Sequence, residues 1–342
     1  MSIDQLAETA QAMVAAGKGI IAIDESTNTI AKRFQGVGVE NSEDNRRAYR
    51  EMLLTTPNLG EHISGAILYD ETLWQKTAAG VPFAQVMAKA GIIPGIKVDK
   101  GPQALAGFPG DLVTEGLDGL RERLKEYASL GARFAKWRAV IAIGEDNPSG
   151  TCIESNCHAL ARYAALCQEA GIVPMVEPEV LMDGDHDIDA CYEVTEITLR
   201  SLFGALYEHN VMLEGTILKA SMVLSGKDCH EQAGVEEVAE YTLRCLKSTV
   251  PAALPGIVFL SGGQSDRDAT AHLDAMNRMG PHPWPLSFSY GRAMQTTAMQ
   301  IWAKDFGANG VGANVAAAQK MVHERARDNG LAALGRWNAK AA

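Results

Sequence analysis

Short apolar runs alternate with longer, helix-like segments along almost the whole chain. Eight runs have the length and the β-branched content of strands, and they cover residues 19–24, 64–70, 94–99, 132–140, 171–180, 213–220, 255–263 and 285–291. The segments between them are amphipathic, and several end in the glycine that often follows a helix. Strands that alternate with helices predict a parallel sheet of the α/β class.

The number of repeats favours a closed barrel. Eight strand–helix units in 342 residues, without a linker or low-complexity segment, predict a single (β/α)8 TIM barrel domain over residues 1–342. An extra N-terminal helix would occupy residues 1–18, and C-terminal helices and a tail would occupy about 305–342. A doubly wound open sheet is the alternative, but it would need a glycine-rich fingerprint after the first strand, where the chain has IAIDEST.

The composition argues against several kinds of partner. A net charge of -11 and a pI near 5.3 do not suit binding to nucleic acid or to an anionic membrane. The first residues carry acids where a signal peptide needs a basic start, and no apolar run is long enough to span a membrane, so we expect a cytoplasmic protein. The six cysteines lack paired zinc spacing and are expected to be reduced thiols.

Charged and hydroxyl side chains gather at one end of the predicted strands. Several lie two residues apart, as Glu177 and Glu179 do, so both side chains of a pair point to the same face of the strand. Charges on an edge strand would be a simpler explanation, but a closed barrel has no edges. The C-terminal strand ends, where such barrels carry their active sites, hold Asp24, Asp99, Lys136, Arg138, Glu177, Glu179, Lys219, Ser261 and Ser289.

Lys219 stands out because it follows the apolar run 216–218 with no polar residue before it. An ammonium group buried in an apolar element costs several kcal/mol unless it is paired or loses its proton. A lysine that extends from a strand end to solvent would be the alternative. The position therefore indicates either a reactive amine at the barrel mouth or a lysine whose ammonium group reaches solvent.

Nine motifs in order carry a family resemblance. They are IAIDEST, IAKR, ENSEDNRR, GIKVDKG, FAKWR, GIVPMVEPE, LEGTILK, FLSGGQS and FSYGRA, and the match runs from about residue 5 to about residue 300. The chain resembles the class I fructose-bisphosphate aldolases, which are metal-independent and act through a Schiff base. The resemblance implies a (β/α)8 barrel that reversibly cleaves fructose 1,6-bisphosphate into dihydroxyacetone phosphate and glyceraldehyde 3-phosphate.

The resemblance makes Lys219 the Schiff-base lysine. A free lysine, with a pKa near 10.4, is almost fully protonated at neutral pH, so a nucleophilic lysine needs burial or a neighbouring cation. Lys136 could supply that cation, because the matching lysine of the family lies beside the Schiff-base lysine. A protonated imine is itself the electron sink for carbon–carbon cleavage, so the resemblance implies no cofactor and no metal.

The resemblance also assigns the proton transfers. Glu177 would be the principal acid/base, with Glu179 close by, and the sequence leaves open which of the two holds the working proton. Asp24 would orient the Schiff-base lysine and the substrate. Asp24 has an alternative role as the N-cap of the next helix, because DESTNTIAKR resembles a helix start.

A bisphosphate needs two anion sites. By resemblance, one phosphate would be held after strands seven and eight, the usual phosphate position of such barrels, by Ser261, Gly262, Gly263 and Arg292, with Ser289 in the same region. The other phosphate would be held by Lys32, Arg33 and Arg138, with Lys97 nearby. The partner implied is thus a small sugar bisphosphate, and family analogy suggests a homotetramer.

Some features of the sequence suggest other interpretations. The acidic segment 183–194 begins like a calcium loop, but Ile188 and Val194 stand where that loop needs glycine and glutamate, so we expect a solvated acidic loop. Another Schiff-base barrel enzyme, such as a transaldolase, or a non-catalytic sugar-phosphate-binding scaffold are the rival functions. Many relatives carry a C-terminal tail that ends in tyrosine, whereas the last tyrosine here is Tyr290, so residues 338–342 are expected to contribute little to cleavage.

Overall fold

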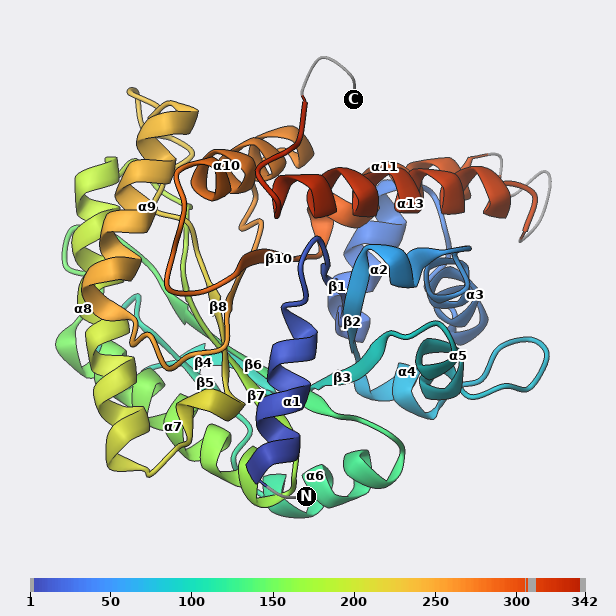
Figure 1. The fold of residues 1–342 in the computed structure, drawn as a ribbon, viewed down its shortest axis with the longest axis horizontal. Coiled ribbons are helices and arrows are strands. Elements are labelled where there is room, and N and C mark those ends of the chain that lie inside the picture. The colour runs from blue at the N-terminus through green and yellow to red at the C-terminus, as the bar shows by residue number, and fades with distance from the viewer. Residues whose placement is uncertain (1–2, 305, 307–311, 339–342) are drawn as a thin grey trace.

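The strands close into a barrel, as the alternation predicted. The structure is a computed structural model that describes residues 3–304, 306 and 312–338. Over these residues, eight parallel strands form a closed barrel in the order β1-β10-β9-β8-β7-β6-β3-β2, which confirms the (β/α)8 fold (Figure 1). The barrel strands are β1 Gly19–Ile23, β2 Ile63–Leu68, β3 Ile93–Lys97, β6 Phe134–Ile141, β7 Val173–Val180, β8 Ile217–Ala220, β9 Ile257–Phe259 and β10 Leu286–Tyr290.

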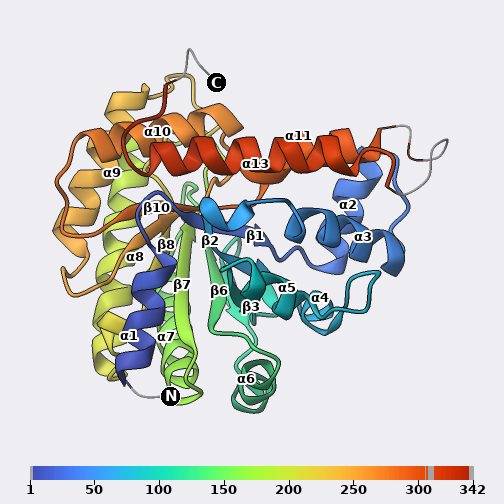
Figure 2. The same cartoon turned by 45° about the vertical axis from the view of Figure 1, so that its right-hand side comes forward.

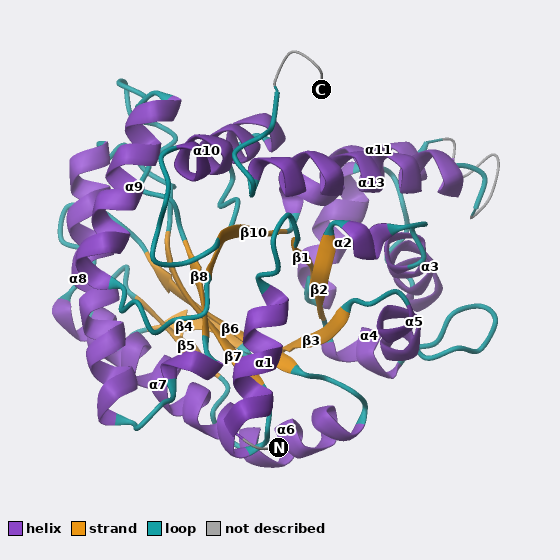
Figure 3. Ribbon diagram, in the orientation of Figure 1, coloured by secondary structure: helices purple, strands orange, loops and turns teal. Residues whose placement is uncertain are grey.

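Helices surround these strands on the outer side (Figure 3). Five begin at a side chain that accepts a backbone N–H, the favoured N-cap arrangement. The α-helices are α1 Ile3–Met13, α2 Thr27–Gly36, α3 Glu43–Leu54, α4 Asp70–Trp74, α5 Phe83–Lys89, α6 Leu120–Ser129, α7 Gly150–Glu169, α8 Ile188–Glu208, α9 Val235–Thr249, α10 Asp266–Arg278, α11 Arg292–Ala303 and α13 Val315–Ala332, and two 3-10 turns cover Leu59–Glu61 and Leu213–Gly215.

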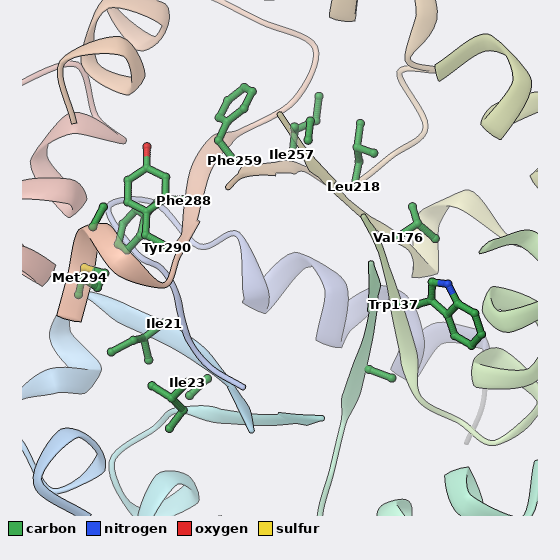
Figure 4. Close-up of a cluster of buried hydrophobic side chains, with 14 of the residues drawn as sticks. Ile21, Ile23, Trp137, Val176, Leu218, Ile257, Phe259, Phe288, Tyr290 and Met294 are labelled. Carbon is green, nitrogen blue, oxygen red and sulfur yellow. The ribbon is translucent and has the colours of Figure 1, made fainter. Parts of the chain in front are cut away.

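Each strand separates apolar from polar side chains by its period of two. Trp137, Val176 and Leu218 point outward into the apolar layer between strands and helices (Figure 4). Their neighbours Lys136, Glu177 and Lys219 therefore point to the inside of the barrel. The same alternation that packs the outer core thus delivers charged groups to the interior.

The N-terminal half of the barrel interior is apolar. Phe134, Met175 and Ile217 belong to one buried cluster, and α1 closes it from the N-terminal side through residues such as Met13. The Phe134 ring fills its place so tightly that a Cβ at Gly95 would lie 2.1 Å from it, which explains a glycine inside β3. This apolar layer excludes water from the N-terminal end of the barrel, so the charged groups next to it are open only towards the C-terminal mouth.

Two local predictions were wrong, and one element was not predicted. The segment 213–220 is strand only from Ile217, because Leu213–Gly215 form a 3-10 turn, where a Cβ on Gly215 would lie 2.5 Å from Met212. The acidic segment 183–194 is a loop only as far as Asp187, whose side chain caps α8 and converts the rest into helix. Residues 101–115, between β3 and α6, contain an antiparallel hairpin that the sequence did not indicate, β4 Gly101–Ala104 with β5 Leu112–Glu115.

The C-terminal region forms helices as expected. α13 runs beside α11 and also packs on α10 (Figures 1 and 2). The expectation for residues 338–342 falls almost entirely on 339–342, which lie outside the described residues. Within the part of the chain that the structure describes, no helix combines the length and the apolar character that crossing a membrane requires.

Candidate active site

One cavity of about 660 Å³ opens at the C-terminal ends of the barrel strands. Thirteen of the fourteen site residues predicted from the sequence line it: Asp24, Lys32, Arg33, Lys97, Lys136, Arg138, Glu177, Glu179, Lys219, Ser261, Gly262, Ser289 and Arg292. They come from seven strands or the segments that follow them and from α2. Gly263 does not line the cavity, but a Cβ there would lie 3.5 Å from the Arg292 guanidinium, so it borders the same corner.

Four groups of alternating charge lie across the floor of the cavity. They are Lys219, Glu177, Lys136 and Asp24, and we call them the lysine row. Lys219 Nζ lies 2.9 Å from Glu177 Oε1, and Lys136 Nζ lies 3.3 Å from Glu177 Oε2. On its other side, Lys136 Nζ lies 2.7 Å from Asp24 Oδ2. The lysines and Glu177 are buried, so each of these charges depends on its neighbours in place of water. Glu177 is therefore the only carboxylate paired with both lysines among the described residues.

The protonation of this row follows from its geometry. Burial alone would raise the pKa of Glu177, but the charges of Lys136, Lys219 and Arg138 outweigh burial and hold that pKa below its ordinary value. Burial is likewise outweighed at Asp24, whose pKa is lowered chiefly by Lys136 and Lys219. Burial would lower the pKa of Lys136, but Asp24 and Glu177 raise it well above its ordinary value. Lys136 is thus a cation at neutral pH, and both carboxyl groups are ionised.

This row predicts how stability depends on pH. Asp24 has a folded pKa below its unfolded value, so its stabilisation is present above pH 3.8 and is lost as the pH falls from there through the lowered value. Lys136 has a raised pKa, so its stabilisation is present below pH 10.5 and is lost only as the pH rises beyond it. We expect Asp24→Asn to reduce the acid loss of unfolding free energy by up to about 1.4 kcal/mol per pH unit. Urea titrations at pH 5, 4 and 3 check this, and equal acid slopes for the two proteins would contradict it.

The second carboxylate of the EPE segment has a different partner. Glu179 is ion-paired with Arg138 and not with the lysine row. Asp99 steadies this side of the cavity, because its carboxylate accepts the backbone N–H of Arg138 at 3.2 Å and lies 3.1 Å from Lys97 Nζ. Glu177 and Glu179 are thus separated by environment, although they share one face of β7.

The corner after β9 and β10 has the donors that an anion needs. Ser261 and Gly262 line it together with Arg292, the first residue of α11. Ser289 also faces the cavity, and its buried hydroxyl has no hydrogen-bond partner among the described residues. A buried hydroxyl without a partner beside a helix N-terminus and a guanidinium fits a phosphate group.

Sequence reasoning missed one buried acid. Glu25 lines the cavity, is ion-paired with Arg33 and accepts a hydrogen bond from Gln295 Nε2 at 3.1 Å. Its only signal was its place directly after Asp24 in IAIDEST. The same segment settles the alternative role of Asp24, because the N-cap of α2 is Ser26. The cavity is also lined by Ala22, Asn28, Thr29, Lys100, Gly101, Pro102, Leu260 and Gly291.

Comparisons with known proteins identify the family of this chain. The model of the family described as "Fructose-bisphosphate aldolase class-I" matches residues 5–342. A protein of Xanthomonas campestris named "Probable fructose-bisphosphate aldolase class 1" is 75% identical over 98% of this chain and 99% of its own length. "Fructose-bisphosphate aldolase 1" of Toxoplasma gondii is 54% identical over 98% of this chain and 92% of its own length.

A solved structure gives the same answer for the fold. It is the fructose-bisphosphate aldolase of Plasmodium falciparum in complex with TRAP and a small-molecule inhibitor, with a TM-score of 0.95 and 48% identity over 98% of this chain and 96% of that one. The chain therefore belongs to the class I fructose-bisphosphate aldolase family, and it reversibly cleaves fructose 1,6-bisphosphate into dihydroxyacetone phosphate and glyceraldehyde 3-phosphate through a lysine Schiff base.

Proposed function

We propose that Lys219 is the lysine that forms the Schiff base in this aldolase. Its amine attacks the C2 carbonyl of fructose 1,6-bisphosphate, and the carbinolamine loses water to give a protonated imine. The bond between C3 and C4 then breaks as a base takes the C4 hydroxyl proton, so glyceraldehyde 3-phosphate leaves and the bonding electrons move into an enamine. Protonation at C3 and hydrolysis release dihydroxyacetone phosphate and restore the amine.

Glu177 is proposed to handle the protons of these steps. Its position 2.9 Å from Lys219 Nζ lets it receive a proton from the attacking amine and return it to the leaving hydroxyl. Its lowered pKa means that it enters the cycle as a base. Lys136 and Asp24 are proposed to orient this pair, and Glu179 to hold Arg138. The separate partners of the two carboxylates support Glu177 as the one that transfers the proton.

The two phosphates are proposed to occupy opposite ends of the cavity. One lies with Ser261, Gly262 and Arg292, with Gly263 and Ser289 at the same corner; the other lies with Lys32, Arg33, Lys97 and Arg138. At the second end, Arg33, Lys97 and Arg138 are ion-paired with Glu25, Asp99 and Glu179, and Lys32 adds a further positive charge. A substrate with an anion at each end would thus be held across the lysine row.

The single observation that carries the proposal is the buried Lys219–Glu177 pair at the floor of a cavity with cations at both ends. Borohydride is expected to inactivate the enzyme only in the presence of dihydroxyacetone phosphate, because it reduces the imine and not the free amine. EDTA is expected to leave activity unchanged, because the protonated imine is the electron sink. Loss of activity in EDTA that zinc restores would overturn the proposal.

Arg292→Ala is expected to weaken substrate binding by roughly 1.5–3 kcal/mol, since a charge-assisted contact to phosphate is lost. That is a rise in KM of about 10- to 150-fold, while imine formation persists at saturating substrate. Steady-state kinetics test this, with Arg121→Ala as the control because Arg121 is half exposed and ion-paired to Glu169. A fall in kcat without a change in KM would remove Arg292 from the phosphate site.

We propose a cytoplasmic homotetramer. A relative in Arabidopsis thaliana, 53% identical, carries the name "Fructose-bisphosphate aldolase 4, cytosolic". The outer surface of α8 exposes two large apolar side chains, Ile197 at 55% and Tyr207 at 85%, as a surface that a second subunit covers would do. Light scattering at micromolar concentration measures the mass, and a value of 36.6 kDa for the chain alone would contradict the tetramer.

A further inference from the structure

The segment after β9 that borders the proposed phosphate corner is a tight turn. Gln264 N–H donates to the Ser261 carbonyl at 2.9 Å, which closes the turn. Between them, Gly262 and Gly263 have φ of 58° and 117°, conformations that side chains other than glycine rarely adopt. Two glycines in succession allow this path but do not enforce it, because glycine has the widest choice of backbone conformations. The turn therefore needs a contact from outside to stay in place.

The side chain of Gln264 makes such a contact. Its Oε1 lies 2.7 Å from Nδ1 of His272, two turns along α10, and its Nε2 lies 3.7 Å from the sulfur of Met222, which follows β8. Gln264 and His272 are both buried. A buried polar pair of this kind fixes orientation well, because each group loses a full hydrogen bond when the other moves. The pair joins the phosphate corner to the outer helix layer.

The chemistry of the imidazole suits this bond. Burial lowers the pKa of His272, with only the charge of Asp268 on the same helix opposing it. The ring is therefore neutral at pH 7 and carries one N–H. Because the Gln264 amide oxygen is an acceptor, the N–H is assigned to Nδ1, which donates to it.

We propose that His272 is a positioning residue for phosphate: through Gln264 it holds the turn 261–263 in the conformation that receives one phosphate of the substrate. This inference rests on the proposed placement of a phosphate at Ser261, Gly262 and Arg292. His272 does not line the cavity, so it acts only through Gln264. Its loss should weaken phosphate binding and leave the chemistry at Lys219 unchanged.

The test compares three variants of α10. His272→Leu removes the donor but keeps most of the volume, and His272→Asn keeps a donor at a similar place. Thr270→Val is the matched control, since Thr270 is buried on the same helix and its hydroxyl bonds to Asn329 of α13, away from the cavity. The measurements are kcat, KM for fructose 1,6-bisphosphate and the inhibition constant of inorganic phosphate.

His272→Leu is expected to raise KM and the inhibition constant of phosphate about fivefold, as a lost hydrogen bond of about 1 kcal/mol implies, with kcat within about twofold. His272→Asn should stay within about twofold of the parent in all three constants, and Thr270→Val should lower the melting temperature without changing KM. Gln264→Leu should match His272→Leu, and the double variant should be no worse. Equal KM values for His272→Leu and Thr270→Val, or a fall in kcat alone, would overturn the positioning role.

The same preparations separate this inference from the proposed function. Borohydride inactivation of the parent protein in the presence of dihydroxyacetone phosphate tests the Schiff base independently of His272. A parent protein that is not inactivated would overturn the proposed function. A parent that is inactivated, together with unchanged phosphate inhibition in His272→Leu, would overturn only the positioning role.

Discussion

Lys219→Met is expected to lower kcat for fructose 1,6-bisphosphate cleavage by about 10⁴-fold or more, roughly 5.5 kcal/mol of barrier. Methionine cannot form an imine, so the route through an enamine is lost and no other group takes its place. The fold should persist, because Glu177 keeps its contact with Lys136 at 3.3 Å and methionine fits a buried site of this length.

Kinetics and thermal unfolding of the same preparation check this expectation. Lys227→Met is the control, because Lys227 is exposed on the segment after β8 and pairs with Asp183 outside the cavity. The control should keep kcat within about fivefold, as the loss of an exposed ion pair costs at most about 1 kcal/mol. A Lys219→Met protein with a tenth or more of the parental kcat would contradict the nucleophile assignment.

Glu177→Gln should give the second largest effect, a fall in kcat of about 10²- to 10⁴-fold with little change in KM. Glutamine keeps the size and the hydrogen-bonding reach of the side chain but cannot carry a proton between amine and hydroxyl. Glu179→Gln is the matched variant, since its carboxylate faces Arg138 and not Lys219. It should raise KM more than it lowers kcat, and equal kinetic defects in the two variants would show that the EPE pair works as one unit.

The barrel could be predicted because its strands and helices differ strongly in period. The outward faces of β6, β7 and β8 carry Trp137, Val176 and Leu218, and the helices cover them, so each strand is buried on both sides and appears in the sequence as an apolar run. The charged inward residues Lys136, Glu177 and Lys219 interrupt those runs only at single positions, each between two apolar residues. The closed strand order follows from eight such units, because consecutive parallel strands tend to pair.

The elements that could not be predicted are short and depend on tertiary contacts. β4 and β5 have four residues each and pair with one another beside the mouth, in a stretch rich in glycine and proline that resembles a loop. The helical start after Asp187 depends on its side chain accepting the backbone N–H of Ala190, which an acidic run does not reveal. Such contacts decide where a short element begins, because an N-cap hydrogen bond stabilises a helix by about 1 kcal/mol.

The residues of the candidate site were easier to predict from the sequence than the hydrogen bonds that hold them in place. Residues at strand ends converge by geometry, so thirteen predicted residues line one cavity. The contacts behind them come from distant segments: Glu25 is held by Gln295 of α11, and Gln264 by His272 of α10. Hydrophobic periodicity and sequence motifs do not reveal such pairs, because Gln295 and His272 each lie in an ordinary amphipathic helix. The sequence suggested that the positive charge of Lys136 favours the neutral form of Lys219. In the structure Lys136 is also ion-paired with Asp24, which offsets part of that charge.

The most direct test is to identify the lysine that the substrate captures. The enzyme is incubated with dihydroxyacetone phosphate, reduced with borohydride, digested and examined by peptide mass spectrometry, with Lys136→Met in parallel to remove the neighbouring amine. Reduction is expected to add the three-carbon phosphate to Lys219 alone in the parent and, more slowly, in Lys136→Met. A label on Lys136, or a labelled Lys219→Met protein, would contradict the account.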